Sequence, residues 1–168
     1  MRKYLATVAL LMQLVLVLAA SGLVLELKSY KVEKVKDPEG NLVEKLVPAV
    51  EVAPGDIVQW VLKARNESEG PLKGVVLVIP VPPQTKYVEG SATPLRLGTT
   101  VITPEFSYDG GQTYGKPPLK KKVKVVVQGK EVIKEVVVPP EQYTHVRWVL
   151  PELPPGHQVE VSIRTVVR

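Results

Sequence analysis

Lysine is the chemically reactive residue type that gathers most sharply in this sequence. Seven lysines lie between residues 116 and 135, where Glu131 and Glu135 are the acids, and the densest part of the cluster comprises Lys120, Lys121, Lys122 and Lys124. Ammonium groups at this density attract anionic polymers such as cell-wall phosphate chains or acidic glycans, and that attraction weakens as salt rises. Lysine also keeps an exposed strand edge from pairing with another chain. The sequence favours this protective role for the hairpin spanning Lys116–Lys134, with contact to an anionic polymer as the alternative.

The same cluster does not indicate a nucleic-acid site. Residues 116–138 contain no aromatic side chain on which bases could stack. Arg2 and Lys3 contribute to the formal charge of +5, and we expect them to be removed with an N-terminal signal, which leaves +3. The basic balance therefore reflects one local cluster, and we predict no nucleic-acid partner.

Histidine and serine offer little for catalysis or metal binding. His145 and His157 are the two histidines, and they lack a Cys or carboxylate companion at the spacing of a metal site. The chain has no Cys at all, which excludes thiol nucleophiles and disulfides. No Gly-x-Ser-x-Gly elbow is present, and Ser91 in a Gly-Ser-Ala turn is a weaker signal. We therefore predict no catalytic residue, no cofactor and no metal, and hence no enzyme.

Two polar motifs have a functional and a structural interpretation. Asp109-Gly110-Gly111 could belong to a calcium loop, but neighbouring acids are missing and a plain hairpin turn is favoured. Asn66-Glu67-Ser68 is an N-glycosylation sequence, which matters only in a glycosylating host. The structural interpretation of Asn66 is a side chain that turns the end of a strand by bonding to backbone.

The N-terminus has the pattern of a secretory signal. Arg2 and Lys3 precede an apolar run from Leu5 to Leu18, and small residues follow at positions 19–22. We predict a cleavable signal peptide at residues 1–22, with cleavage near Ser21 or Gly22. An uncleaved membrane anchor is the alternative, because no charge occurs between Lys3 and Glu26 and about 20 apolar residues suffice to span a bilayer.

The rest of the chain consists of strands and turns. Valine makes up about a fifth of the sequence, and glycine and proline together about a sixth. Residues 57–65 alternate clearly, with Val58, Trp60, Leu62 and Ala64 on one face. No window shows a helical period, which predicts an all-β protein of two packed sheets. The other clear strands are 75–79, 122–127, 131–138, 145–150 and 158–167.

Turn residues predict two hairpins. Asp37-Pro38-Glu39-Gly40 suits a type I turn between strands at 32–35 and 42–47, after a weakly alternating stretch at 23–27. Gln128-Gly129-Lys130 joins the two strands that carry the lysines. Trp60 and Trp148 each lie in the middle of an apolar strand, and we predict that both are structural core residues.

Between about residues 51 and 167 a series of short blocks follows one another in a distinctive order: 52–60 with Pro54-Gly55-Asp56, Asn66, 72–82, 87–92, 106–111, 146–148, 153–156 and 159–166. In these blocks and their order the chain resembles domain of unknown function 11, also called the conserved repeat domain, a family of prokaryotic cell-envelope modules. The resemblance implies an immunoglobulin-like sandwich at the cell surface, usually as one module of an array. This chain departs from the pattern by its single copy and by its longer Lys-rich hairpin.

These observations together predict a signal peptide at 1–22, an N-terminal strand or hairpin extension at 23–48 and an immunoglobulin-like antiparallel sandwich at 49–168. We expect an exported, non-catalytic structural or interaction module in the periplasm, at the cell surface or outside the cell. Its expected partners are envelope proteins or a cell-wall polymer, and it touches the membrane only through an uncleaved signal. A fibre assembled by strand addition of the mature N-terminus from Leu23 is a further alternative. Scarce Asn, absent Cys and proline-rich loops indicate a thermophilic host.

Overall fold

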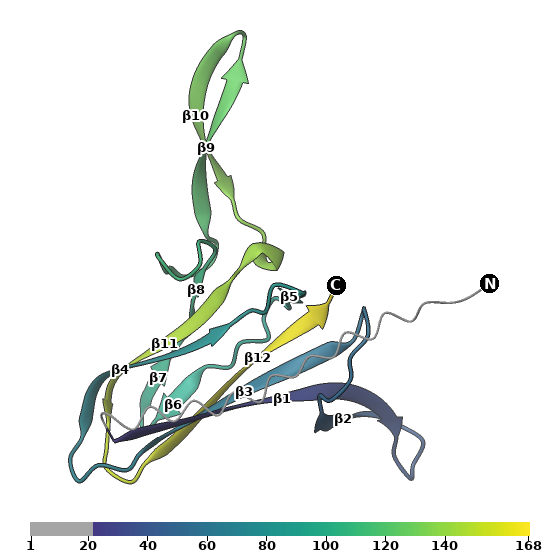
Figure 1. Cartoon of the computed structure of the whole chain (residues 1–168), viewed down its shortest axis with the longest axis vertical. Helices are drawn as coiled ribbons and strands as arrows, with labels where there is room; N and C mark the ends of the chain where they lie inside the picture. Colours follow the sequence, from purple (N-terminus) through teal and green to yellow (C-terminus); the bar gives the residue numbers. More distant parts are fainter. Residues whose placement is uncertain (1–21) are drawn as a thin grey trace.

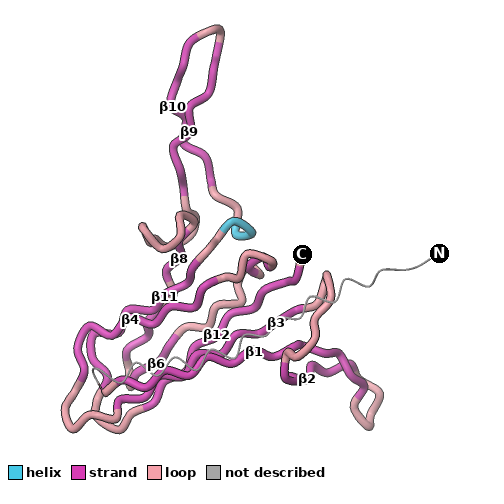
Figure 2. The backbone as a smooth tube through the Cα atoms, in the orientation of Figure 1, coloured by secondary structure: helices cyan, strands magenta, loops and turns pink. Residues whose placement is uncertain are grey.

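The computed structural model describes residues 22–168. The predicted signal peptide, apart from its last residue Gly22, therefore lies outside the described residues. Strands dominate this part of the chain, and its one helical element is a single short turn (Figure 2). None of its helical residues forms a segment long and apolar enough to cross a membrane. The elements, in order, are β1 (Leu23–Lys36), β2 (Leu42–Pro48), β3 (Ile57–Asn66), β4 (Leu72–Pro80), β5 (Thr85–Tyr87), β6 (Leu95–Leu97), β7 (Thr100–Ile102), β8 (Glu105–Ser107), β9 (Lys120–Val127), β10 (Lys130–Val137), the 3-10 helix η1 (Pro140–Gln142), β11 (His145–Leu153) and β12 (Gln158–Val167).

Two antiparallel sheets pack face to face as an immunoglobulin-like sandwich, which confirms the predicted fold class (Figure 1). The five-stranded sheet has the order β2-β1-β3-β12-β5, and the three-stranded sheet has the order β4-β11-β8. Strands β6 and β7 form a short ribbon beside them. Among the strands of residues 22–168, β9 and β10 pair only with each other, and they project away from the sandwich (Figure 1).

Strand β3 shows how sequence alternation builds the core. Its even-numbered residues from Val58 to Ala64 are buried, as the alternation predicts, and they face the interior of the sandwich. The three-stranded sheet supplies the opposite wall, in which Leu77, Ile79 and Leu150 are fully buried. The sandwich is therefore held by the apolar inner faces of two sheets, without disulfides.

Both tryptophans lie in this core, as predicted. Trp60 and Trp148 are almost completely buried, and each indole N–H finds an acceptor. Trp60 Nε1 donates to Thr165 Oγ1 at 2.9 Å, and Trp148 Nε1 donates to the Thr93 carbonyl at 2.8 Å. Satisfied donors let the two indoles contribute their large apolar area without an unpaired polar group.

The N-terminal strand differs from the prediction. The stretches 23–27 and 32–35 were expected as separate strands, but they belong to one strand, β1, of 14 residues. Its first part, 23–31, pairs with β3 in the five-stranded sheet, and its second part, from Tyr30 on, pairs with β2. Residues 23–31 are therefore part of the sandwich, and the hairpin beyond them extends from it (Figure 1). The weak alternation concealed this continuity because β1 is half-buried along most of its length.

The turn of the lysine hairpin is shorter than predicted. Lys130 begins β10, so the connection consists of Gln128 and Gly129, with φ values of 50° and 75°. Positive φ at both central residues is the signature of a type I′ turn, whose twist matches that of paired strands. Each residue of β9 therefore pairs with one residue of β10, from Val127 and Lys130 at the tip to Lys120 and Val137 at the base.

Candidate functional site

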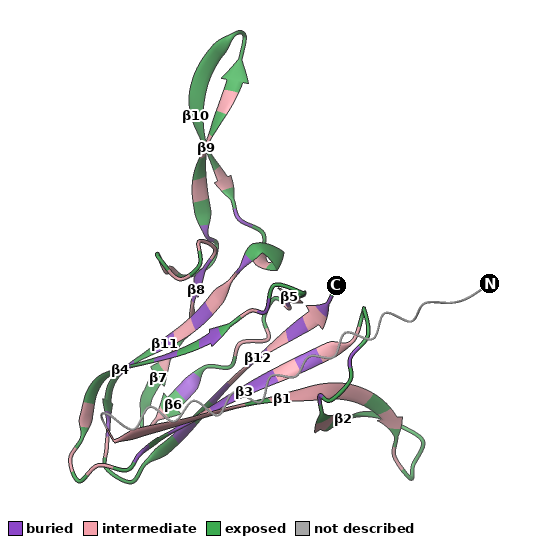
Figure 3. Cartoon of the chain, in the orientation of Figure 1, coloured by how far each residue is buried: buried purple, intermediate pink, exposed green. Residues whose placement is uncertain are grey.

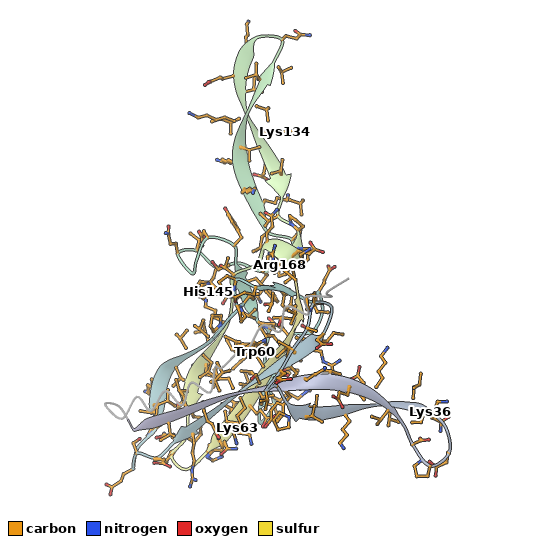
Figure 4. All side chains as sticks on the ribbon, turned by 45° about the vertical axis from the view of Figure 1, so that its right-hand side comes forward. Lys36, Trp60, Lys63, Lys134, His145 and Arg168 are labelled. Atoms are coloured by element: carbon orange, nitrogen blue, oxygen red, sulfur yellow. The ribbon has the colours of Figure 1, made fainter. Side chains whose placement is uncertain are left out.

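The hairpin formed by β9 and β10 is the candidate site, because it carries the predicted lysines and projects furthest from the sandwich (Figure 1). Its base is fixed by two residues that flank the strands. Leu119 and Val138 are buried, and the Val138 N–H donates to the Leu119 carbonyl at 2.7 Å. Beyond this base the hairpin lies free of the sandwich, and Lys134 stands far from Trp60 in the core (Figure 4).

Register divides the hairpin into two faces, since paired residues of an antiparallel ladder point to the same side. Lys122 pairs with Glu135 and Val126 with Glu131, whereas Val125 pairs with Val132. The first set makes a mixed-charge face: Lys120, Lys122, Lys124, Glu131 and Glu135 with Val126, Ile133 and Val137. The second set makes a lysine–valine face: Lys121, Lys130 and Lys134 with Val123, Val125, Val127, Val132 and Val136.

The structure therefore separates the four predicted contact lysines. Lys120, Lys122 and Lys124 share the mixed-charge face, and Lys121 lies on the other. Lys120 Nζ is 3.5 Å from Glu135 Oε1, with both side chains about half exposed, so this ion pair contributes little to stability. The lysine–valine face holds three ammonium groups and no acid. Its positive potential is therefore the less neutralised of the two.

The distal part of the hairpin is apolar, which sequence analysis missed. Val126 is 71% exposed and Ile133 68%, and Val127 and Val132 are exposed beside them. We call these four residues the apolar tip. Figure 3 shows the contrast between the exposed hairpin and the buried strands of the sandwich. Val126 and Ile133 share the mixed-charge face, and Val127 and Val132 share the other, so each face of the distal hairpin exposes an apolar pair. Exposed apolar residues close together mark a contact surface, and an isolated two-stranded hairpin is only marginally stable in water.

The two histidines do not come together. His145 begins β11 and its Nδ1 lies 3.0 Å from Thr144 Oγ1, whereas His157 is exposed in the turn before β12, near Asn66. Within residues 22–168, no three His, Cys, Asp or Glu residues cluster in a way that could hold a metal ion.

The carboxylate of Asp109 is hydrogen-bonded to residues of its own loop. Its carboxylate accepts hydrogen bonds from Ser107 Oγ at 2.7 Å, from the Thr113 N–H at 2.9 Å and from Thr113 Oγ1 at 2.5 Å. The Thr113 hydroxyl contributes most to holding the pKa of Asp109 down at about 2, with the Thr113 N–H and Ser107 adding to it. These bonds make Asp109 the organiser of a turn, in line with the favoured structural interpretation.

The side-chain amide of Asn66 likewise makes its hydrogen bonds within the fold. It is fully buried; its Nδ2 donates to the Gly70 and Leu153 carbonyls at 2.9 Å each, and its Oδ1 accepts from the Ser68 N–H and hydroxyl. The predicted strand-end turn is confirmed. A glycan on Asn66 is incompatible with this folded structure.

Arg147 anchors a loop in a way that no sequence signal indicated. Its guanidinium lies 4.1 Å from the ring centre of Tyr114, and its Nη2 is 3.2 Å from Glu105 Oε2. Within the described residues, its buried Nε has no hydrogen-bond partner. The cation–π contact and the ion pair hold the loop carrying Tyr114 against the outer face of the three-stranded sheet.

Comparison with models of known protein families, with characterised proteins and with solved structures found no match to this chain. The resemblance to the conserved repeat domain therefore stays a prediction, and the function is argued from the geometry.

Proposed function

We propose that this chain is an exported, non-catalytic module of the cell envelope, whose sandwich presents the β9/β10 hairpin to a partner. The observation that carries the proposal is the apolar tip, which stands clear of the body with Val126 and Ile133 about two-thirds exposed or more. A rigid scaffold that displays an exposed apolar element is typical of a binding module.

The polar groups support the same view, because they are used to build the scaffold. Asn66, Asp109 and Arg147 make internal hydrogen bonds or ion pairs. Each fixes a strand end or a loop, and a well-fixed body is what a displayed hairpin requires. The lysines of β9 then serve to keep its free edge soluble.

An alternative is a binding module for an anionic cell-wall polymer. The lysine–valine face favours it, because Lys121, Lys130 and Lys134 share that face with no acid. Contact through these lysines would weaken as salt screens the charges.

The third candidate, a fibre that donates its mature N-terminus, has less support. Leu23–Lys31 already pairs with β3 of the same chain, so donation would require this strand to leave its own sheet.

Retention of the protein in the envelope fraction of expressing cells tests the proposal. We expect the wild-type protein there, with its N-terminal residue at Gly22 or close to it, and we expect the Val126→Ser/Ile133→Ser variant to be released. The matched control is Val101→Ser, which changes an exposed valine of β7 on the body and leaves retention intact.

Salt separates the two leading candidates. Release of the wild-type protein by high salt, with loss of retention in Lys121→Gln/Lys130→Gln/Lys134→Gln, would favour the anionic polymer. Equal retention of all variants, or a chain found only in the cytoplasm, would contradict the proposal.

A further inference from the structure

Strand β4 is a long edge strand with one side unpaired. It lies at the end of the three-stranded sheet and pairs with β11 from Leu72 to Pro80, except at Gly74. Among residues 22–168, no strand pairs with its outer side. Its backbone N–H and C=O groups on that side are open to another strand.

This edge is unusual because a long run of it, beyond Lys73 near its start, carries no charge. From Gly74 to Pro80 it reads Gly-Val-Val-Leu-Val-Ile-Pro. The other free edges of the described chain are blunted, because charged or short strands resist pairing with a second chain. Four of these strands, β5, β6, β7 and β8, are short, with three residues each. The others are charged: β1 carries Glu26 and Lys28 on its free part, β2 carries Glu44 and Lys45, and β9 and β10 carry lysines and glutamates.

The outer face beside this edge is apolar as well. Val75, Leu77 and Ile79 point into the core and are buried, so Val76 and Val78 point outward and are exposed. Val149 of β11 lies directly opposite Val76 and is also exposed. The free edge therefore continues into a valine surface.

Two residues limit the part of the edge that can pair. Gly74 has a φ of +63°, outside the extended range, so it bends the strand. Pro80 at the other end has no N–H to offer. The five residues between them, Val75–Ile79, form the usable edge.

We propose that this edge pairs with the same edge of a second copy, antiparallel and about a two-fold axis at Leu77. In that register Val76 faces Val78 of the second copy, Val75 faces Ile79, and Gly74 meets Pro80. The two residues that end the usable edge, Gly74 of one copy and Pro80 of the other, then lie opposite each other. No charged residue opposes another. Cross-strand pairs of β-branched residues are favourable, and an isologous contact of this kind closes at two copies.

The edge fits itself better than it fits the other described strands. A partner strand from β9 or β10 would bring lysine or glutamate against the valine surface, whereas a second β4 brings valine. A five-residue edge is smaller than the roughly 800 Å² per partner of a standard interface, so we expect a dimer that forms with rising concentration.

Register-specific cross-linking tests the proposal, because the chain has no Cys of its own. We would prepare Val76→Cys and Val78→Cys as separate proteins and oxidise each alone and the two mixed. The two-fold register places residue 76 opposite residue 78, so the mixture should give several times more covalent dimer than either protein alone. Equal cross-linking in all three samples would overturn it.

Sedimentation of the reduced, unmodified chain provides the second readout. We expect a monomer–dimer equilibrium that Val76→Lys abolishes while leaving the circular dichroism spectrum unchanged. Val101→Lys is the matched control, since Val101 is 47% exposed and Val76 48%, and it should dimerise like the wild type. A wild-type chain that stays monomeric at the highest attainable concentration would overturn the proposal and leave β4 as an acceptor for a strand of a different protein.

Discussion

The molecule carries two hairpins that look alike in the sequence and differ in how they are held. Both join alternating strands by a tight turn, and both extend from the sandwich, as the positions of Lys36 and Lys134 show (Figure 4). The β1/β2 hairpin continues the five-stranded sheet, because β1 runs on to pair with β3. The two strands of the β9/β10 hairpin pair with each other and with no further strand of the described chain.

Side chains reinforce the difference. Arg164 of β12 reaches Glu44 of β2 with two hydrogen bonds of 2.7 and 3.1 Å, and Lys31 of β1 lies 3.0 Å from Asp56. Within the part of the chain that the structure describes, one side-chain contact ties the β9/β10 hairpin to the body, and it is long: Lys121 Nζ lies 3.4 Å from Gln142 Oε1. The comparison teaches that the β1/β2 hairpin is part of the scaffold, whereas the β9/β10 hairpin is displayed by it.

Truncating one apolar side chain in each hairpin should give the largest contrast. Leu27 of β1 packs against the core, so Leu27→Ala should lower the free energy of unfolding by about 2 kcal/mol. Ile133 of β10 is exposed, so Ile133→Ala should change it by less than about 0.5 kcal/mol. Urea denaturation of both variants measures the difference. Equal losses would mean that β9/β10 shares the cooperative unit of the sandwich.

Removing cations should affect the displayed β9/β10 hairpin and a fully paired strand of the sandwich differently. Lys122→Thr/Lys124→Thr takes charges from the free edge of β9, so self-association should rise several-fold in a light-scattering assay. Lys63→Thr/Arg65→Thr makes the same charge change on β3, which is paired with β1 on one side and with β12 on the other, and little change is expected. If both double variants aggregate alike, net charge rather than edge protection explains the lysines.

Acid should weaken the attachment of the β1/β2 hairpin to the sandwich, with a smaller effect on stability than the Leu27→Ala substitution. The hydrogen bonds from Arg164 hold the pKa of Glu44 below its ordinary value of 4.5. Glu44 therefore stabilises the fold above about pH 4.5, and this contribution is lost as the pH falls through its lowered pKa. We expect the melting temperature to drop over that range by less in Arg164→Gln than in the wild type. An identical pH profile would show that the pair does not tie the hairpin to the body.

Local patterns accounted for much of the fold. Alternation placed Val58, Trp60, Leu62 and Ala64 on the core face, and the turn residues located both hairpins. The continuity of β1 was missed because it depends on pairing with β3, whose partner residues lie 27 to 43 positions away in the sequence. Strand pairing between distant segments is a long-range property that local periodicity does not contain.

The candidate site was predicted in composition but not in shape. The lysine cluster was evident, yet the division into two faces depends on a two-residue turn in place of the expected three. A one-residue change of register moves every side chain to the other face. The exposure of the apolar tip could not be predicted from hydrophobicity, which favours burial. It arises because no sheet formed by residues 22–168 covers the hairpin.

Hydrogen exchange of the protein, alone and bound to the envelope fraction of its host, distinguishes a displayed β9/β10 hairpin from one that is fixed to the sandwich. The account predicts that amides of β9 and β10 exchange quickly in the free protein, while those of β1 opposite β3 are protected close to the global limit. On binding, protection should rise in β9 and β10 and stay unchanged in β1 and β2. Protection of β9 and β10 already complete in the free protein, or a binding footprint confined to other strands, would contradict it.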